Sequence, residues 1–351
     1  MKLAQLVPRQ HRGDAIGDNA IAIRDLGKHL GFDSRIFYLD CDNDALLDGE
    51  PIGHYHRWCD RSTTSILHYA LPSSLSHVFS DSPGRRFLLY HNITPPIHLL
   101  GYPLYQKIAM AGRAELASMR NTCDKAFADS EFNRDELDRM GFRNTEVIPI
   151  YLDFDRYRIP SDPVLERMFE DDFANVLYVG RITPNKCQHD LIRLFSVFKH
   201  YVHPKSRLVL IGKYDGFETY YTQLVKLAVQ LGIGDVYMPG KVSQQELVTW
   251  YRKAAIFVSM SEHEGFCVPL VESLHFRVPV LAFAAGAVPG VLAGTGVLFH
   301  DKHDRVLLAE TMEQMIADID LRASLIEHQT QRLADLSQES VFRLWNQALS
   351  G

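Results

Sequence analysis

The stretch "SEHEGFCVPLVESLHFRVPVLAF", residues 261–283, places Glu264 and Glu272 on either side of what reads as a helix start. It follows the apolar run "IFVSM" (256–260) and ends on a second apolar run, "VLAF" (280–283). Short continuous apolar runs separated by segments with helical periodicity are typical of parallel strands that are covered on both faces. The stretch therefore predicts a strand, a loop, a helix and a second strand of one parallel sheet.

Similar apolar runs recur through both halves of the chain, and two such sets predict two doubly wound α/β domains. The first half contains "LAQLV" (3–7), "RIFYL" (35–39), "ILHY" (66–69), "FLLY" (87–90), "AFA" (126–128) and "VIPI" (147–150). The second half contains "VLYV" (176–179), "LVLI" (208–211), "VYM" (236–238), "IFV" (256–258), "VLAF" (280–283) and "VLF" (297–299). We expect an N-terminal domain over 1–155 and a C-terminal domain over 156–335.

The segment 336–351 forms a third element, a helix with Val341 and Trp345 on one apolar face. An apolar stripe of that kind has to pack on something. We expect it to cross back onto the N-terminal domain, with packing inside the C-terminal domain as the alternative.

Composition limits the class of protein. The chain has 351 residues, 46% hydrophobic and 23% charged, with a formal net charge of −6, which argues for a globular protein and against general nucleic-acid binding. Its five cysteines are odd in number and widely spaced, which favours reduced thiols in the cytoplasm. The uncharged segment 278–299 is long enough to span a membrane, but its prolines and glycines divide it into strand, loop and strand.

The helix start near Pro269 is the first candidate site, because ligands bind outside the carboxyl ends of the strands in an open parallel sheet. Proline suits the first helical turn, and the backbone amides at such a helix end can hold a phosphate. The segment expected to bind the phosphate comprises Cys267, Val268, Pro269 and Leu270. Glu272, roughly 5 Å further along the helix, would accept from both hydroxyls of a ribose. Glu264 would reach a sugar on the distal phosphate. The alternative is that both glutamates are solvated acids on the protein surface.

The stretch "VLYVGRITPNKCQHDLI" (176–192) supplies cations at the same edge of the sheet. Arg181 follows a strand, and Lys186 precedes a helix. A diphosphate beside two carboxylates needs positive compensation, which an arginine and a lysine provide through charge-assisted hydrogen bonds. The alternative is an ordinary surface arginine and a lysine that flanks a helix.

These motifs resemble a known family. "GRITPNK", "EHEGFCVPLVE" and "AAGAVPGVLAGTGVLF" are similar to sequences of the retaining family 4 glycosyltransferases of the GT-B superfamily. "QHRGDAIGDNAIAIRDLGKHLGFDSRIF", "YHNITPP" and "DSEFNRDEL" resemble a bacterial branch that builds surface polysaccharide. The resemblance implies the GT-B fold, an α/β architecture in which two Rossmann-like domains face each other across a cleft.

The resemblance also implies roles for the C-terminal domain. Arg181 and Lys186 would bind the donor diphosphate and stabilise the departing nucleoside diphosphate. Glu264 would contact the transferred sugar, together with the backbone amides of Gly265, Phe266 and Cys267. Cys187 departs from the family pattern because many relatives have glycine there.

In the N-terminal domain, the resemblance implies that His91 faces the donor sugar. Gly13 would let the backbone approach the phosphates. Asn92, Thr94 and His68 are expected to shape the acceptor side of the cleft.

The resulting interpretation is a cytoplasmic, retaining hexosyltransferase. Its donor would be a nucleoside diphosphate sugar, GDP-mannose or a UDP-hexose, and its acceptor a saccharide or lipid-linked saccharide. No cofactor, no metal and no nucleic acid are expected. The alternatives are a catalytically idle sugar-nucleotide-binding subunit, a GT-B epimerase and a GT-B phosphorylase.

Three other patterns suggest weaker hypotheses. "DCD" (40–42) has the look of a metal-binding acid pair but also of an exposed acidic loop. "GHYHRWCD" (53–60) could be drawn as a zinc site, although its spacing matches no standard arrangement. "YPLYQKIAMAGRAELASMR" (102–120), with Lys125 beyond it, could touch the inner face of a membrane or could be an ordinary amphipathic helix.

Overall fold

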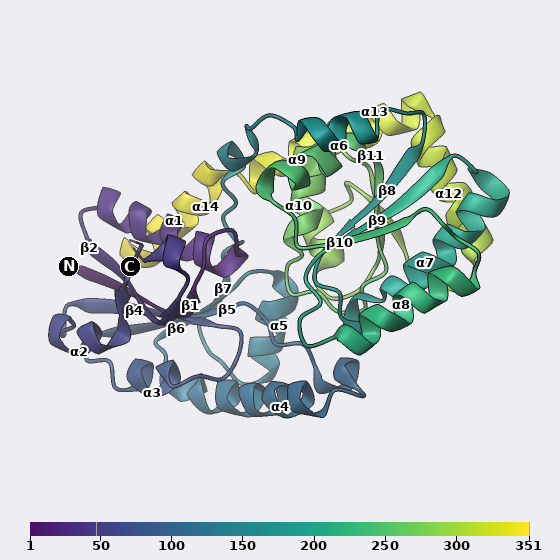
Figure 1. Cartoon of the computed structure of the whole chain (residues 1–351). Coiled ribbons are helices and arrows are strands. Elements are labelled where there is room, and N and C mark those ends of the chain that lie inside the picture. The colour runs from purple at the N-terminus through teal and green to yellow at the C-terminus, as the bar shows by residue number, and fades with distance from the viewer. Residues whose placement is uncertain (47, 351) are drawn as a thin grey trace. The chain divides into compact units, whose positions relative to one another are not determined.

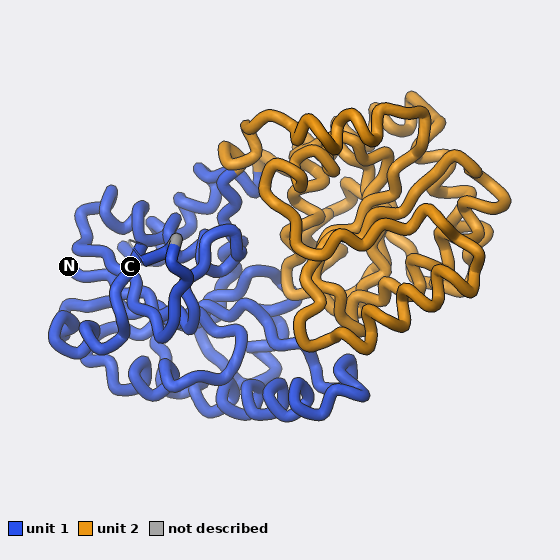
Figure 2. The backbone as a smooth tube through the Cα atoms, in the orientation of Figure 1, with its two compact units in different colours: residues 1–153, 335–351 blue, residues 154–334 orange. Residues whose placement is uncertain are grey.

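The computed structural model describes residues 1–46 and 48–350, which form two compact units (Figure 2). Unit 1 comprises residues 1–153 and 335–351, and unit 2 comprises residues 154–334. Each unit is built on one parallel sheet flanked by helices, so the predicted doubly wound α/β class is confirmed.

The sheet of unit 1 has seven strands among the described residues, in the order β3-β2-β1-β4-β5-β6-β7. The strands are β1 (Lys2–Gln10), β2 (Asp33–Cys41), β3 (Glu50–Pro51), β4 (Thr63–Tyr69), β5 (Arg85–Tyr90), β6 (Lys125–Ala128) and β7 (Thr145–Val147). The α-helices are α1 (Ala15–His29), α2 (Tyr55–Trp58), α3 (Leu75–Ser80), α4 (Pro103–Ser118), α5 (Glu131–Arg139) and α14 (Gln338–Ser350). The strand order reverses between β1 and β4. In Figure 1, α1 and α14 lie on one face of the sheet, and α3 and α4 lie on the other.

Unit 2 repeats the plan with six strands among its described residues, in the order β10-β9-β8-β11-β12-β13. The strands are β8 (Ala174–Val179), β9 (Ser206–Ile211), β10 (Val236–Gly240), β11 (Ala254–Ser259), β12 (Val280–Phe283) and β13 (Val297–Phe299). The α-helices are α6 (Pro163–Met168), α7 (Gln188–Val197), α8 (Glu218–Gln230), α9 (Gln244–Lys253), α10 (Val268–His275), α11 (Val288–Leu292), α12 (Arg305–Ala317) and α13 (Ile319–Asp335). Here the order reverses between β8 and β11, the two strands that carry the candidate motifs.

Helix α14 completes the core of unit 1. Its apolar face, with Val341 and Trp345 buried, packs into one cluster with Leu3 of β1 and Ile23 of α1. The Trp345 ring lies 5.2 Å from that of Phe127. The last helix of the chain therefore contributes to a core that begins with the first strand.

The uncharged segment 278–299 forms β12, the short helix α11 and β13, and so is part of the sheet of unit 2. Among the residues that the structure describes, no helix combines the length and the hydropathy that crossing a bilayer requires. The division into strand, loop and strand, predicted from the prolines and glycines, is confirmed apart from the short helix in the loop.

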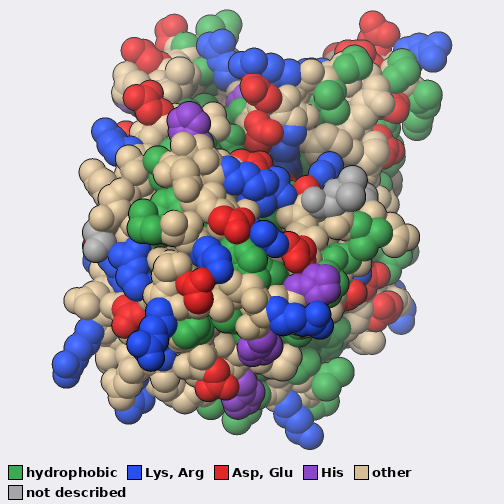
Figure 3. Space-filling model, turned by 90° about the vertical axis from the view of Figure 1, so that its left-hand side faces the viewer, with side chains coloured by type: hydrophobic (Ala, Val, Ile, Leu, Met, Phe, Trp, Pro, Cys, Tyr) green, Lys and Arg blue, Asp and Glu red, His purple; other side chains and the backbone are tan. Residues whose placement is uncertain are grey.

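On one face of the molecule, positive and negative side chains are mixed (Figure 3). Several basic groups are neutralised locally, such as Arg9 with Asp42 at 2.6 Å. This face does not present the continuous basic stripe by which proteins follow a nucleic-acid backbone.

Replacing Trp345 tests the contribution of α14. Trp345 is 1% exposed, and truncating a buried tryptophan costs about 3–5 kcal/mol. We expect Trp345→Ala to lower the free energy of unfolding by that amount in urea titrations. Tyr201→Ala, at an 84% exposed aromatic, serves as the control and should change it by less than about 0.5 kcal/mol. Equal effects of the two changes would contradict a core role for α14.

Candidate functional site

The candidate site of unit 2 lies where β8 and β11 pair as parallel neighbours. The loop after β8 carries Arg181 and a 3-10 turn, Pro184–Lys186. The loop after β11 carries Glu264 and leads into α10. The strand order reverses between these two strands, and the carboxyl edge at such a reversal is the usual ligand position in a doubly wound sheet.

The two loops are joined by hydrogen bonds and an ion pair. The Glu262 amide donates to the Asn185 carbonyl at 2.9 Å. The Lys186 ammonium lies 2.6 Å from Glu264 Oε2 and 3.5 Å from the His263 carbonyl oxygen. The structure thus brings Lys186 and Glu264 into direct contact, which the sequence predicted only as proximity at one edge.

This ion pair is largely shielded from water, with the side chains of Lys186 and Glu264 19% and 7% exposed. A buried carboxylate without a partner would be costly, and the Lys186 ammonium supplies that partner for Glu264. The pair is neutral as a unit. Attraction for an anionic ligand at this edge must therefore come largely from Arg181 and from the N-terminus of α10.

Arg181 is exposed and lies against the segment that follows β9. Its guanidinium lies 5.7 Å from the Phe217 ring centroid, and Nη2 is 3.5 Å from the Asp215 carbonyl oxygen. Among the described residues it makes no hydrogen bond or ion pair with Lys186 or Glu264. The two predicted cations therefore differ: Lys186 is committed to Glu264, whereas Arg181 has donors available to a ligand.

The start of α10 has a strained backbone. Its N-cap, Cys267, has a φ of 71° and provides no side-chain hydrogen bond to the helix. The Leu270 amide donates to the Cys267 carbonyl at 3.0 Å, and Pro269 has no amide hydrogen. Of the four residues predicted to bind phosphate through their backbone amides, this leaves Cys267 and Val268. Gly265 and Phe266 lie in the loop immediately before this helix, and Val268 is its first residue.

Two further positions have a demanding backbone geometry. Cys187, the N-cap of α7, has a φ of 51°, the left-handed conformation that favours glycine, the residue that the resemblance implies at this place. Gly286, with a φ of 58°, approaches the Glu264 backbone so closely that a Cβ atom would lie 2.5 Å from its carbonyl oxygen. Gly286 therefore helps to fix the loop of Glu264, a role that the sequence interpretation missed.

Glu272 lies in the first turns of α10, 3% exposed. Its oxygens accept hydrogen bonds from two tyrosines, Tyr157 at 2.5 Å and Tyr251 at 2.7 Å. The Arg156 guanidinium is 3.7 Å away. The sequence interpretation assigned none of these three residues to the site.

In unit 1, His68 of β4 and His91 immediately after β5 stand side by side with stacked rings, 5.2 Å apart. His91 Nε2 lies 3.0 Å from His68 Nδ1, and His91 Nδ1 lies 2.8 Å from Asp129 Oδ2. His68 Nε2 lies 2.9 Å from Gln5 Oε1. Both ring nitrogens of His91 are engaged, so either nitrogen can reach a sugar only after one of these bonds breaks.

The proton positions along the hydrogen-bonded series Gln5–His68–His91–Asp129 follow from those of Gln5. The Gln5 amide nitrogen donates to the Ala20 carbonyl at 2.7 Å, so Gln5 Oε1 accepts from His68 Nε2–H. Burial lowers the pKa of His68 well below its usual range, and its Nδ1 therefore accepts from His91 Nε2–H. His91 Nδ1 and Asp129 must then share one proton.

Asp129 completes the chain at a buried position. Burial raises the pKa of its carboxyl group, while the adjacent His91 opposes that rise. Its second oxygen, Oδ1, has no hydrogen-bond partner among the described residues, which also disfavours the charged form. Asp129 is the first residue of the motif "DSEFNRDEL", directly after β6, and the sequence interpretation assigned no role to it.

The other predicted residues of unit 1 occupy the same edge of its sheet. Asn92, with a φ of 80°, donates to Asn133 Oδ1 at 2.7 Å. Gly13, with a φ of 77°, follows β1, and its amide donates to Asp18 Oδ1 at 3.0 Å. Thr94 is half-buried in the loop after β5. The predicted acceptor residues are thus near one another, but Asn92 is tied to α5.

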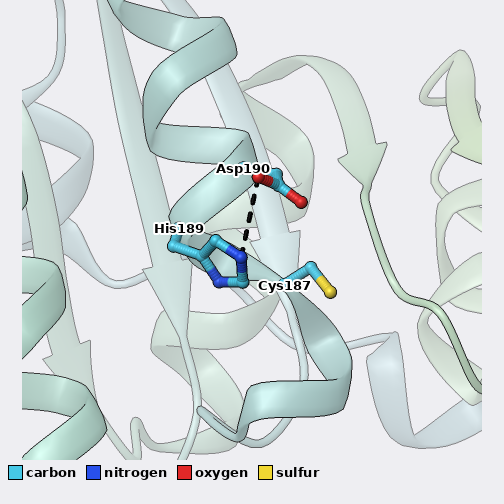
Figure 4. Close-up of side chains that lie close together, drawn as sticks. All are labelled: Cys187, His189 and Asp190. Atoms are coloured by element: carbon cyan, nitrogen blue, oxygen red, sulfur yellow. Dashed lines mark ion pairs between the residues drawn. The ribbon is translucent and has the colours of Figure 1, made fainter. Parts of the chain in front are cut away.

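Figure 4 shows Cys187, His189 and Asp190 at the start of α7, whose potential ligand atoms lie within 4.8 Å of one another. The charges nearby do not favour a cation here. The Lys302 ammonium is 3.6 Å from Asp190, and Arg193 pairs with the same carboxylate at 3.1 Å. Burial raises the pKa of the Cys187 thiol to about 12, which disfavours the thiolate that a metal needs.

The weaker metal patterns are occupied by local partners. Asp40 and Asp42 of "DCD" both pair with Arg9. In "GHYHRWCD", Asp60 pairs with Lys2 at 2.6 Å and His54 lies 3.1 Å from Glu50. These contacts are those of ordinary surface ion pairs.

Comparison with known proteins connects this site to a class of enzymes. Residues 167–332 match the family model for glycosyl transferases group 1, and this range lies within unit 2. A D-inositol 3-phosphate glycosyltransferase of Xylanimonas cellulosilytica is 28% identical over 201 residues, which cover 54% of this chain and 46% of that protein. The amylovoran biosynthesis glycosyltransferase AmsD of Erwinia amylovora is 25% identical over 187 residues, covering 52% of this chain and 51% of AmsD.

The chain spans about half the length of these curated relatives. In fold, it is similar over its full length to Anabaena Alr3699/HepE, solved in complex with UDP and glucose, with a TM-score of 0.71 and 17% sequence identity. The alignment covers 100% of both chains. The fold is thus of the GT-B type. The chain is thus similar to proteins named as glycosyltransferases, the class that the motifs resemble.

Asp129 provides a test of the proton count. Asparagine permanently supplies an N–H where Asp129 and His91 share a proton, so Asp129→Asn should retain the series of hydrogen bonds. Asp129→Ala leaves His91 Nδ1 without a partner and should cost about 1–3 kcal/mol. Urea unfolding of both variants makes the comparison. If Asp129→Asn is as destabilising as Asp129→Ala, the shared proton is wrong and the carboxylate charge is required.

Proposed function

We propose that this chain is a retaining glycosyltransferase that transfers a hexosyl group from a nucleoside diphosphate sugar to a hydroxyl of a saccharide or lipid-linked saccharide. It would act in the cytoplasm, in polysaccharide or glycoconjugate synthesis, with no metal required. The relatives named above support the general class. The UDP and glucose bound to Alr3699/HepE make UDP-glucose the first donor to test, ahead of GDP-mannose.

One observation carries the proposal: the Lys186–Glu264 ion pair lies at the β8–β11 switch point, beside the N-terminus of α10. A diphosphate at that helix end would receive backbone amides and the guanidinium of Arg181. Glu272, further along the same helix, would accept from the ribose. Glu264 would accept from hydroxyls of the transferred sugar, together with the amides of Gly265, Phe266 and Cys267.

The chemistry places the largest demand on the leaving group. When the bond between the sugar C1 and the phosphate oxygen breaks, the sugar gains oxocarbenium character and the phosphate gains negative charge. A fixed cation accelerates this step if it interacts more strongly with the departing diphosphate than with the bound donor. Arg181 and the amide end of α10 would perform that task, and Lys186 would keep Glu264 from repelling the phosphate.

The competing functions differ in their products. A transferase releases nucleoside diphosphate and a new glycoside, an epimerase releases no transferred product, and a phosphorylase requires inorganic phosphate. An idle subunit binds donor and turns nothing over. Ligand-observed NMR with uridine, guanosine and adenosine diphosphate sugars, followed by the anomeric configuration of any product, separates these outcomes and tests retention.

Arg181 is the residue on which this mechanism depends most directly. We expect Arg181→Ala to lower turnover by about two to three orders of magnitude, comparable with the loss of one transition-state stabiliser. Arg193→Ala removes a half-buried arginine from the nearby helix α7 and should leave turnover nearly unchanged. The measurement is release of nucleoside diphosphate in the presence of acceptor. Near-normal turnover in Arg181→Ala would remove Arg181 from the mechanism.

We further propose a peripheral contact of unit 1 with an anionic lipid surface. Ile97, Leu100, Leu104 and Met110 at and before α4 are 61–65% exposed, and Lys107 is exposed among them. Two of the basic residues first considered for this face are committed elsewhere: Arg113 pairs with Glu136, and Lys125 with Glu146. The contact would therefore depend on apolar insertion more than on charge.

Vesicles of anionic phospholipid test this contact by co-sedimentation. Burying a leucine side chain is worth about 1.5–3 kcal/mol, so Leu104→Glu should weaken binding by about tenfold or more. Val229→Glu places the same charge at a 74% exposed apolar residue of unit 2 and is the matched control. Absence of vesicle binding by the wild-type protein would rule the contact out.

A further inference from the structure

The carboxylate of Glu272 is held by hydroxyl groups from two separate segments of unit 2. Tyr157 ends the 3-10 segment Phe154–Tyr157 that opens the unit and donates to Glu272 Oε1 at 2.5 Å. Tyr251, near the end of α9, donates to Oε2 at 2.7 Å. Each oxygen of the carboxylate therefore has one tyrosine donor.

Both tyrosines are buried, Tyr157 at 2% exposed and Tyr251 at 0%. Burial, and the Glu272 charge after it, raise the pKa of each phenol above its usual range, so both remain O–H donors at neutral pH. A phenol that stays protonated beside a carboxylate can only donate to it. The direction of both hydrogen bonds is thus fixed.

The tyrosine rings are themselves held by packing. The Tyr251 ring stacks on Phe276 with centroids 4.9 Å apart and planes 2° from parallel. Tyr157 packs edge-on against the same Phe276 at 5.4 Å, and Phe154 stacks on His275 at 4.7 Å. Phe276 and His275 lie at the end of α10, the helix that carries Glu272. One carboxylate thereby joins three parts of unit 2, namely the segment before its first helix, α9 and α10.

The acceptor capacity of Glu272 is only half used by this arrangement. An ionised carboxylate offers about four acceptor directions, two on each oxygen. The tyrosines take one on each, and the Arg156 guanidinium, at 3.7 Å, is beyond hydrogen-bond distance. Among the residues that the structure describes, no further hydrogen bond to this carboxylate is present, so one direction per oxygen remains for a ligand with two adjacent hydroxyl groups.

We propose that Tyr157 and Tyr251 are positioning residues that fix Glu272 as a rigid acceptor for the vicinal 2′,3′-diol of the donor's ribose. The inference rests on the proposed function, because it takes the ligand of α10 to be a nucleoside diphosphate sugar. A carboxylate already held by two donors loses little side-chain freedom when it binds the diol, which strengthens binding without a new contact. The tyrosines would thus contribute to selection of ribonucleotides over deoxyribonucleotides.

The test compares a ribonucleotide with its 2′-deoxy counterpart on four proteins: the wild type, Tyr157→Phe, Tyr251→Phe and Tyr55→Phe. The probes are UDP, GDP or ADP, whichever the wild type binds, and the matching 2′-deoxynucleoside diphosphate, with dissociation constants from calorimetry. Tyr55→Phe is the control, since it removes an equally buried hydroxyl, 2.8 Å from Ser65, in unit 1.

We expect the wild type to prefer the ribonucleotide by about tenfold to a hundredfold, the effect of one hydrogen bond to a charged group. Tyr157→Phe and Tyr251→Phe should each reduce that preference by about threefold or more, and should weaken the deoxynucleotide less than the ribonucleotide because the deoxynucleotide keeps only the 3′-hydroxyl. Retained binding of the deoxynucleotide also shows that the variant is folded. Tyr55→Phe should retain the full preference.

The outcomes distinguish failure of the positioning role from failure of the proposed function. If both variants keep the wild-type preference, the positioning role is overturned and the proposed function stands. If Tyr157→Phe binds the ribonucleotide more tightly, Tyr157 competes with the diol, which also overturns the inference. If the wild type does not distinguish the two nucleotides, or binds none, the placement of the donor on α10 fails and the inference fails with it.

Discussion

The ion pair between Lys186 and Glu264 is the interaction on which the candidate site depends. It joins the loops that leave β8 and β11, the strands between which the sheet order reverses. A reversal of strand order opens a crevice because neighbouring loops turn to opposite faces of the sheet. Here the loops on the two sides of the reversal are held together by a charge pair at 2.6 Å.

The backbone around this pair is correspondingly constrained. Cys187 and Cys267 each adopt a left-handed conformation at the start of a helix, which costs a non-glycine residue about 1–3 kcal/mol. Gly286 fits against the Glu264 backbone where no side chain would. Strain of this kind is retained only where the surrounding packing fixes the conformation, and it coincides in unit 2 with the candidate ligand edge.

Much of the fold could be predicted from the sequence because each strand is a continuous apolar run and each motif follows one. The meeting of Lys186 and Glu264 follows from the same rule, since carboxyl ends of adjacent parallel strands share one edge. The tyrosine contacts to Glu272 could not be predicted, because Tyr157 and Glu272 are 115 residues apart and a tyrosine in an apolar context carries no sign of where its hydroxyl points. His68, within the run "ILHY", likewise looks like a core residue until its three-dimensional neighbours are known.

The division of unit 1 into residues 1–153 and 335–351 affects how the molecule can form. Unit 2 is an insertion in the sequence of unit 1, and Trp345 fills a position among residues synthesised at the opposite end of the chain. Until α14 has left the ribosome, the first sheet exposes an apolar face that only a later segment can cover. Unit 1, most of which is synthesised first, therefore cannot complete its core until α14 has been made. The whole of unit 2 is synthesised before that point.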